Sequence, residues 1–180
     1  QYVQSVADLA HKHDLKLHID GARIFNAATA YNVSVSAMTA GADSITFCLS
    51  KGLCAPVGSV LVGDAAFISE ARRMRKVVGG GMRQAGVVAA AGLIALHEMS
   101  QRLQEDHDNA AYLAEGLSDA PGITVLSTAT NFVFFVLEED AKLTPDAFKA
   151  ALAEQDIMVN PYPGYKRKFR CVMHYWITRE

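Results

Sequence analysis

Apolar and polar positions follow two different periods at the start of the chain. Over residues 1–13 apolar side chains recur every three or four positions, which predicts an amphipathic helix. Over residues 15–20 (LKLHID) apolar and polar residues alternate, and the run ends on an acid followed by Gly21. This pattern predicts a strand and then a turn.

Strand-like and helix-like segments continue to alternate along the rest of the chain. We expect strands over 43–49, 58–62, 123–126, 131–137, 157–160 and 169–177, and helices over 34–40, 65–77, 82–99, 101–117 and 144–155. Thr144-Pro145 is a good helix start, with a capping hydroxyl and proline at the first helical position. This order of elements favours an α/β fold.

The pattern of predicted elements changes near residue 120, at the Pro121-Gly122 turn. Before it the helices are long, whereas after it short strands dominate. We expect part of a large domain over residues 1–100 and a small α+β domain over residues 101–180.

Composition narrows the classes of function. Of the 180 residues, 51% are hydrophobic and 20% charged, which is globular rather than disordered composition. The formal net charge of −2 gives no general attraction to nucleic acid or to an anionic membrane. The longest apolar run, residues 85–96, is too short and too rich in Gly and Ala to span a bilayer. We therefore expect no nucleic-acid or membrane partner.

The three cysteines form no CxxC pair, so a disulfide framework or a zinc site is not expected, and a reducing compartment such as the cytoplasm fits best. Gln1 opens the chain inside a helical pattern, and the last residues resemble a helix start. We expect the chain to be a piece of a longer protein.

Asp20 is the first residue that suggests chemistry. A carboxylate at the carboxyl end of a strand in an α/β sheet lies where such sheets bind ligands. Beside a cationic ring nitrogen, it would keep that nitrogen protonated. An aspartate in this position also commonly caps a turn or a helix, so both roles stay open for Asp20 alone.

Lys51 lies just past the strand predicted over 43–49, between Ser50 and Gly52. Small neighbours allow a bulky ligand to approach the backbone. A partly desolvated lysine can lose its proton and form a Schiff base with a carbonyl. Pyridoxal phosphate (PLP) needs such a lysine and an acid for its pyridine nitrogen. Isolated lysines are mostly solvated, but two such groups at strand ends in one α/β pattern favour a PLP site.

Three segments together resemble the low-specificity L-threonine aldolase family of fold-type-I PLP enzymes: LHIDGARIFNAA (17–28), DSITFCLSKGLCAPVGSVLVGD (43–64) and GGGMRQAG (79–86). The resemblance covers essentially the whole chain and is strongest over residues 15–96. It implies part of a PLP-dependent transferase-like large domain of the aspartate aminotransferase type, with a mainly parallel sheet, followed by a small α+β domain.

The resemblance implies roles for five residues. Lys51 would hold PLP covalently, and Asp20 would pair with its pyridine nitrogen. Arg23 would help to hold the cofactor's phenolic oxygen or the substrate carboxylate. Arg83 would reach the cofactor phosphate, usually that of a neighbouring subunit. Arg170 would bind the substrate α-carboxylate, for which its planar fork is suited.

The implied reaction is cleavage of L-threonine, L-allo-threonine or a similar β-hydroxy-α-amino acid to glycine and an aldehyde. The implied enzyme is a homodimer or homotetramer with shared active sites and no metal. The family's N-terminal half would supply a Gly-rich phosphate turn and a histidine that stacks on PLP. Neither is found in this sequence, so we expect the isolated chain to be inactive. Two alternatives stay open: another fold-type-I lyase or aminotransferase-like enzyme, and an inactive truncated domain.

Other candidates have simpler interpretations. His11 and His13 are two residues apart on a predicted helix and do not share a face, so we expect solvated side chains rather than a metal site. We expect His18 and His174 to be packed or hydrogen-bonded. His174 also shares a strand face with Arg170, because the two are four residues apart.

The remaining aromatic, basic and thiol groups are expected to be structural or solvated. We assign Phe132, Phe134 and Phe135 to the core. Cys48 and Cys54 are expected to pack as small hydrophobic residues. In the basic cluster 166–170, only Arg170 is expected to have a specific role.

Overall fold

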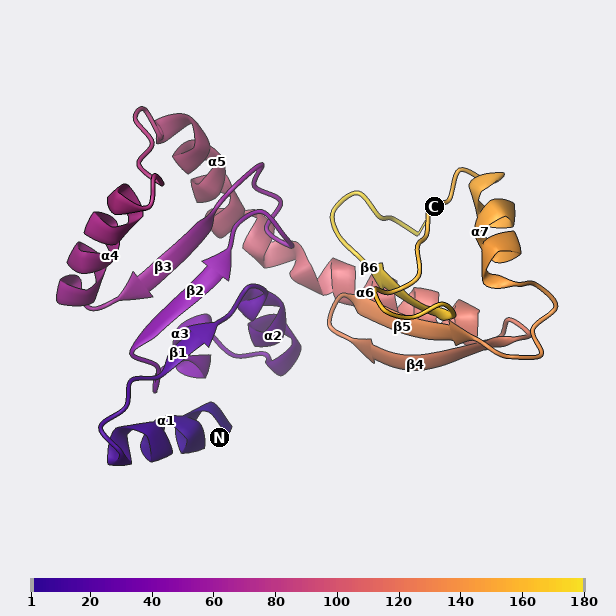
Figure 1. The fold of residues 1–180 in the computed structure, drawn as a ribbon, viewed down its shortest axis with the longest axis horizontal. Helices are drawn as coiled ribbons and strands as arrows, with labels where there is room; N and C mark the ends of the chain where they lie inside the picture. The colour runs from indigo at the N-terminus through magenta and orange to yellow at the C-terminus, as the bar shows by residue number, and fades with distance from the viewer. Residues whose placement is uncertain (1, 180) are drawn as a thin grey trace. The chain divides into compact units, whose positions relative to one another are not determined.

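The fold is that of a computed structural model, which describes residues 2–179 (Figure 1). The described chain divides into two compact units, with the boundary between Leu103 and Gln104. No described helix combines the length and the apolar character needed to cross a membrane.

The first unit is a three-stranded sheet with helices. Its elements are α1 (Tyr2–Lys12), β1 (His18–Asp20), α2 (Ile24–Tyr31), α3 (Val35–Met38), β2 (Ser44–Cys48), β3 (Ser59–Gly63), α4 (Ala65–Val77), α5 (Gly86–His97) and a 3₁₀ turn, η1 (Met99–Arg102). The strand order is β1-β2-β3, with β1 parallel and β3 antiparallel to β2. The sheet is therefore mixed, which refines the expectation of a mainly parallel one.

Asp43 ties α1 to the start of β2. Its carboxylate accepts hydrogen bonds from the Leu17 backbone N–H (2.8 Å) and the Lys16 ammonium (2.9 Å), and contacts the His11 ring nitrogen at 2.8 Å. The expectation that His11 is merely solvated is wrong, because this ring pairs with a carboxylate far along the chain. These partners, the His11 hydrogen bond first, hold the pKa of Asp43 well below its ordinary value.

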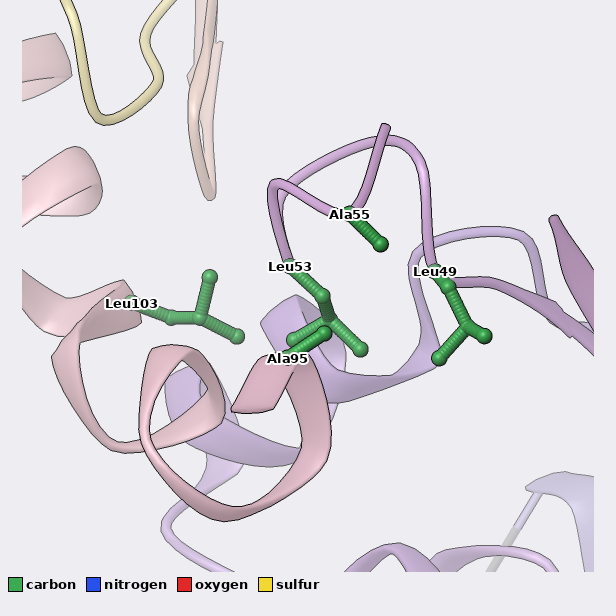
Figure 2. Packing of buried hydrophobic residues seen from close by; sticks show 5 residues of the cluster. All are labelled: Leu49, Leu53, Ala55, Ala95 and Leu103. Carbon is green, nitrogen blue, oxygen red and sulfur yellow. The ribbon is translucent and has the colours of Figure 1, made fainter. Parts of the chain in front are cut away.

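The core of the first unit lies beside the loop that follows β2. Figure 2 shows Leu49, Leu53 and Ala55 from this loop, with Ala95 of α5 and Leu103. Phe25 and Phe47 pack against this cluster and meet edge to face, with ring centroids 5.3 Å apart. The loop is thus part of the core.

The second unit is an antiparallel sheet with two helices. It contains α6 (Leu103–Ser118, of which only Leu103 belongs to the first unit), β4 (Ile123–Ala129), β5 (Phe132–Leu137), α7 (Pro145–Ala153) and β6 (Lys168–Val172). The strand order is β4-β5-β6. The Thr144 hydroxyl accepts the Ala147 N–H at 3.2 Å, which confirms the predicted cap.

Burial alternates strictly along β5, so its two faces differ. Val133, Phe135 and Leu137 are buried in the core, where Phe135 stacks on Phe169 with ring centroids 5.1 Å apart. Phe132 and Phe134 point to the opposite face and are only half-buried. Assigning them to the core is wrong, because residues two apart on a strand share a face.

Predicted strands differ from the structure most at two places, whereas β1 is only shorter than predicted and β4 only longer. Residues 157–160 form no strand; only Pro161 makes an isolated bridge, to Phe169, since a proline lacks the N–H that a ladder needs. The strand predicted over 169–177 ends at Val172, because its partner β5 begins at Phe132. His174 therefore lies beyond the strand, and the spacing argument that joined it to Arg170 fails.

The helices are closer to expectation, with two differences. α5 begins at Gly86 instead of residue 82, since Gln84 has a left-handed backbone (φ 50°) that interrupts a helix. α2 was not expected at all. Its sequence, IFNAATAY, is only eight residues long, and Ile24, Asn26 and Ala28 are buried along it.

Candidate functional site

Asp20 and Lys51 follow from two neighbouring parallel strands. Asp20 ends β1 and pairs in register with Thr46 of β2. β2 ends at Cys48, three residues before Lys51. The carboxyl ends of parallel strands meet at one edge of a sheet, which is where open α/β sheets bind ligands. The structure thus brings the two predicted residues to the same sheet edge.

The turn after Asp20 is fixed by the backbone of β2. The Gly21 N–H donates to the Thr46 carbonyl at 2.7 Å, and the Cys48 N–H donates to the Ala22 carbonyl at 3.4 Å. A Cβ on Gly21 would lie 3.0 Å from the Ile24 Cβ and 3.3 Å from the Thr46 oxygen. Glycine therefore allows the close approach that holds Asp20 at the end of β1.

The Lys51 loop, residues 49–58, is closed by its own hydrogen bonds. The Leu49 N–H donates to the Gly58 carbonyl (2.9 Å), and the Ala55 N–H donates to the Leu49 carbonyl (3.0 Å). The carbonyl of Lys51 itself accepts from the Cys54 N–H at 3.0 Å. Cys54 has a left-handed backbone, with φ of 59°, and lets the chain reverse just after Lys51.

Apolar burial anchors the same loop. Leu49, Leu53 and Ala55 are all buried, and Leu53 points toward Ala95 and Leu103 (Figure 2). A Cβ on Gly52 would lie 2.9 Å from the Asn26 Oδ1 atom, so no larger residue fits there without a shift. Lys51 is therefore an exposed residue on a packed backbone.

The two charged groups have no protein partner. Both side chains are exposed, and within residues 2–179 neither the Lys51 ammonium nor the Asp20 carboxylate makes a hydrogen bond or ion pair. On the Asp20 face of the sheet, His18 makes polar contacts with Ser44 Oγ (2.8 Å) and Thr46 Oγ1 (3.4 Å). This hydrogen-bonded His18 is one of the two outcomes expected for it.

The residues present fit PLP. The cofactor needs a lysine amine for its aldehyde and a carboxylate for its pyridine nitrogen. Lys51 and Asp20 offer these groups from one sheet edge, and neither is already engaged by the described protein. A structural carboxylate such as Asp43, by contrast, is held by three partners.

The two other arginines of the first unit differ in position. Arg23 is half-buried and immediately precedes α2, three residues after Asp20, so the chain places it beside the sheet edge. Arg83 is exposed in the segment between α4 and α5. Among the described residues, no hydrogen bond or ion pair joins Arg83 to Asp20 or Lys51.

Arg170 lies in the second unit, on the exposed side of β6. Its guanidinium carbon is 5.3 Å from the ring centre of Tyr162 and 5.6 Å from that of Phe132. These two rings were missed at the sequence level. The sequence held one indication of them. Phe132 and Phe134 are two residues apart on a strand, so they share one face, and Phe135 lies on the other.

Two cysteines lie close to Lys51 in the sequence. Among residues 2–179, no cluster of three or more His, Cys, Asp or Glu side chains could hold a metal ion. Cys48 Sγ accepts a hydrogen bond from the Ser59 hydroxyl at 3.4 Å, and Cys54 Sγ lies 3.6 Å from the Gly52 carbonyl. Both thiols are half-buried, as expected for packing residues.

Comparison with known families decides the assignment. The model of the beta-eliminating lyase family matches residues 1–140, most of the chain. The chain belongs to this family. Among beta-eliminating lyases and their relatives, it is 46% identical to low-specificity L-threonine aldolase 1 of Arabidopsis thaliana over 99% of its length. It is 45% identical to the low specificity L-threonine aldolase of Escherichia coli K12 over its whole length.

Solved structures show the same fold for this beta-eliminating lyase chain. A Listeria monocytogenes protein provisionally named an L-allo-threonine aldolase matches 96% of the chain with a TM-score of 0.83 at 20% identity. Mouse CSAD matches 95% of it with a TM-score of 0.70 at 18% identity. The fold is therefore that of fold-type-I PLP enzymes.

The chain spans about half the length of the relatives it matches: 50% of the Arabidopsis protein, 52% of the E. coli protein and 50% of the Listeria structure.

Proposed function

We propose that this chain forms part of a PLP-dependent lyase that cleaves L-threonine, L-allo-threonine or a similar β-hydroxy-α-amino acid to glycine and an aldehyde in the cytoplasm. The observation that carries the proposal is the pairing of two unengaged charges, Lys51 and Asp20, at the carboxyl edge of two parallel strands. The identity of 45–46% to named threonine aldolases supports the choice of reaction.

Each residue of the sheet edge has a distinct task in this proposal. Lys51 binds the cofactor covalently through its amine, which requires an amine free of ion pairs. Asp20 keeps a proton on the pyridine nitrogen, because a neighbouring negative charge favours the protonated ring. When bound, PLP supplies the electron sink for the electron pair left on Cα as the Cα–Cβ bond breaks.

The arginines bind anions. Arg23 lies close enough in the chain to Asp20 to hold the cofactor's phenolic oxygen or the substrate carboxylate. Arg170 binds the substrate α-carboxylate through its planar fork. Arg83, which is exposed and has no hydrogen bond or ion pair within residues 2–179, binds the cofactor phosphate of a neighbouring subunit. This last assignment requires a homodimer or homotetramer with shared active sites.

Borohydride trapping tests the covalent assignment. The protein is incubated with PLP, reduced with sodium borohydride and digested, and the modified peptide is identified by mass. We expect the label on Lys51, and no label in Lys51→Ala. Lys166 is the matched internal control, because it is an exposed lysine like Lys51 and must stay unlabelled. Label on another lysine would contradict the proposal.

Product analysis tests the reaction. Incubation of L-threonine with the complete PLP-loaded enzyme should yield glycine and acetaldehyde in equal amounts, whereas the isolated chain should be inactive. Ammonia and a keto acid would instead identify another lyase of the same fold. Mixing the chain with the polypeptide that supplies the rest of its relatives' length shows whether the site needs both parts.

A further inference from the structure

The outer face of the second sheet carries two cations on an aromatic surface. Lys168 and Arg170 are two residues apart on β6 and therefore point to the same face. Lys168 Nζ is 5.0 Å from the ring centre of Tyr165, 5.2 Å from Phe134 and 5.6 Å from Tyr162. All three distances are within the range of a cation–π contact.

Tyr162 is the ring that both cations share. It lies 5.3 Å from the Arg170 guanidinium carbon and 5.6 Å from the Lys168 ammonium. Two like charges on one strand face repel each other and tend to turn apart. An aromatic ring that contacts both offsets this repulsion, because its negative face attracts each cation.

The backbone fixes Tyr162 in this place. Its N–H donates to the Lys168 carbonyl at 2.6 Å, and its own carbonyl accepts from the Tyr165 N–H at 2.9 Å. The preceding residue, Pro161, bridges to Phe169 of β6. The Tyr162 ring also meets Phe134 edge to face, with centroids 5.6 Å apart. Its position is therefore set independently of Arg170.

We infer that Tyr162, together with Phe132, is a positioning residue that holds the Arg170 guanidinium in the orientation that receives the substrate carboxylate. The inference rests on the proposed function, in which Arg170 binds that carboxylate. The two rings contact the guanidinium, while Arg170 remains exposed and so accessible to an anion. Restricting a long, flexible side chain in advance lowers the entropy lost when the ligand binds.

Tyr165 supplies a matched control. It is an exposed tyrosine of the same segment that contacts Lys168, whereas the rings in contact with Arg170 are Phe132 and Tyr162. Tyr162→Leu should raise KM for L-threonine about twofold to fivefold, the factor of an exposed cation–π contact, with kcat unchanged. Tyr165→Leu should leave both constants unchanged. Tyr162→Phe keeps the ring and should behave as the parent enzyme.

The experiment uses the complete PLP-loaded enzyme and has a second readout. The Nε–Hε NMR signal of Arg170, assigned by its loss in Arg170→Gln, is displaced by the ring currents of its two neighbours. Tyr162→Leu should move this signal toward that of a solvated arginine, and Tyr165→Leu should not. Phe132→Leu should raise KM in the same way as Tyr162→Leu, which keeps the inference testable if Tyr162→Leu does not fold.

The possible outcomes distinguish the positioning role of Tyr162 and Phe132 from the proposed role of Arg170 in binding the substrate carboxylate. If Arg170→Gln raises KM about tenfold or more while Tyr162→Leu and Phe132→Leu leave it unchanged, the positioning role is wrong and the proposed function stands. If Tyr165→Leu raises KM as much as Tyr162→Leu, the effect is a general loss of the sheet face and the inference fails. If Arg170→Gln leaves KM unchanged, both the carboxylate-binding role and the inference fall.

Discussion

The two candidate functional cations, Lys51 and Arg170, are held in opposite ways. The backbone of the Lys51 loop is closed by hydrogen bonds and buried side chains, but its amine contacts no protein group among the described residues. On β6 the backbone is an ordinary strand, and the guanidinium itself rests on two rings. The difference matches the chemistry: an amine that must form a covalent bond has to stay free, whereas an arginine that must recognise a planar anion gains from being oriented beforehand.

Removing the amine gives the largest expected effect and tests the first half of this comparison. Lys51→Ala should abolish both borohydride trapping and threonine cleavage, because no other described group at this sheet edge can bind the cofactor covalently. Lys51→Arg is the control that keeps the charge, and it should be equally inactive. Activity in either variant, measured as acetaldehyde release, would show that Lys51 is only a solvated surface lysine.

Neutralising the acid at the neighbouring strand end should have the next largest effect. Asp20→Asn should lower kcat about tenfold to a thousandfold, since loss of a close opposite charge shifts the pKa of a cationic partner by about one to three units. Trapping on Lys51 should persist. An unchanged kcat would mean that Asp20 only caps a turn. The position of Asp20 and Lys51 at neighbouring strand ends would then be no evidence for a cofactor site.

Gly52→Ala changes the backbone under Lys51 without touching the amine. The new methyl group would lie 2.9 Å from the Asn26 Oδ1 and 3.3 Å from the Leu103 Cδ2. We expect the free energy of unfolding to fall by about 1–3 kcal/mol, with weaker PLP binding, measured by urea denaturation and by cofactor titration.

Gly116→Ala is the matched control for that substitution. Gly116 lies inside α6 and a Cβ there meets nothing within 4 Å. This change should be neutral or raise the free energy of unfolding by about 0.5–1 kcal/mol. Equal losses in the two variants would show that the Lys51 loop is no more tightly packed than an open helix face.

The smallest expected effect is on the stability of α1 and involves Asp43, a carboxylate that already has three protein partners. Its folded pKa lies well below the ordinary value of 3.8, with the His11 hydrogen bond as the largest cause. The stabilisation is therefore fully present above that ordinary pKa and is lost as the pH falls through the folded pKa. Protection factors of the α1 amides, which correct for the pH dependence of intrinsic exchange, should fall modestly on acidification, and Asp43→Asn should remove this acid dependence. A variant that keeps the full acid response would contradict the role of Asp43.

Local patterns were enough to place Asp20 at the end of one strand and Lys51 just after another. Each follows an alternating or apolar run. The small residues after them, Gly21 and Gly52, indicate turns. Such local patterns could not predict the two rings that contact Arg170. Tyr162 is eight residues from Arg170, across a segment that contains Pro163 and Gly164. The hydrogen bond from its N–H to the Lys168 carbonyl and the bridge between Pro161 and Phe169 bring the ring back over the strand.

The ends of elements depended on partners that a single run of sequence does not show. β6 stops at Val172 because β5 offers no further residue to pair with. α2 was missed since its eight residues are fewer than the run over which a helical period becomes clear. Asp43 likewise gave no sign of its bonds to His11 and Lys16, which come from distant positions in the chain.

The register shift in β4 has a consequence for the protein's behaviour in crowded solution. Pairing with β5 slips between Val125 and Ser127, and the unpaired Leu126 is half exposed at the outer strand of its sheet. A bulge adds local twist and breaks the even row of donors and acceptors that a second chain would need in order to add a strand. β4 is therefore a poor template for edge-to-edge aggregation, although no strand within residues 2–179 pairs with its outer side.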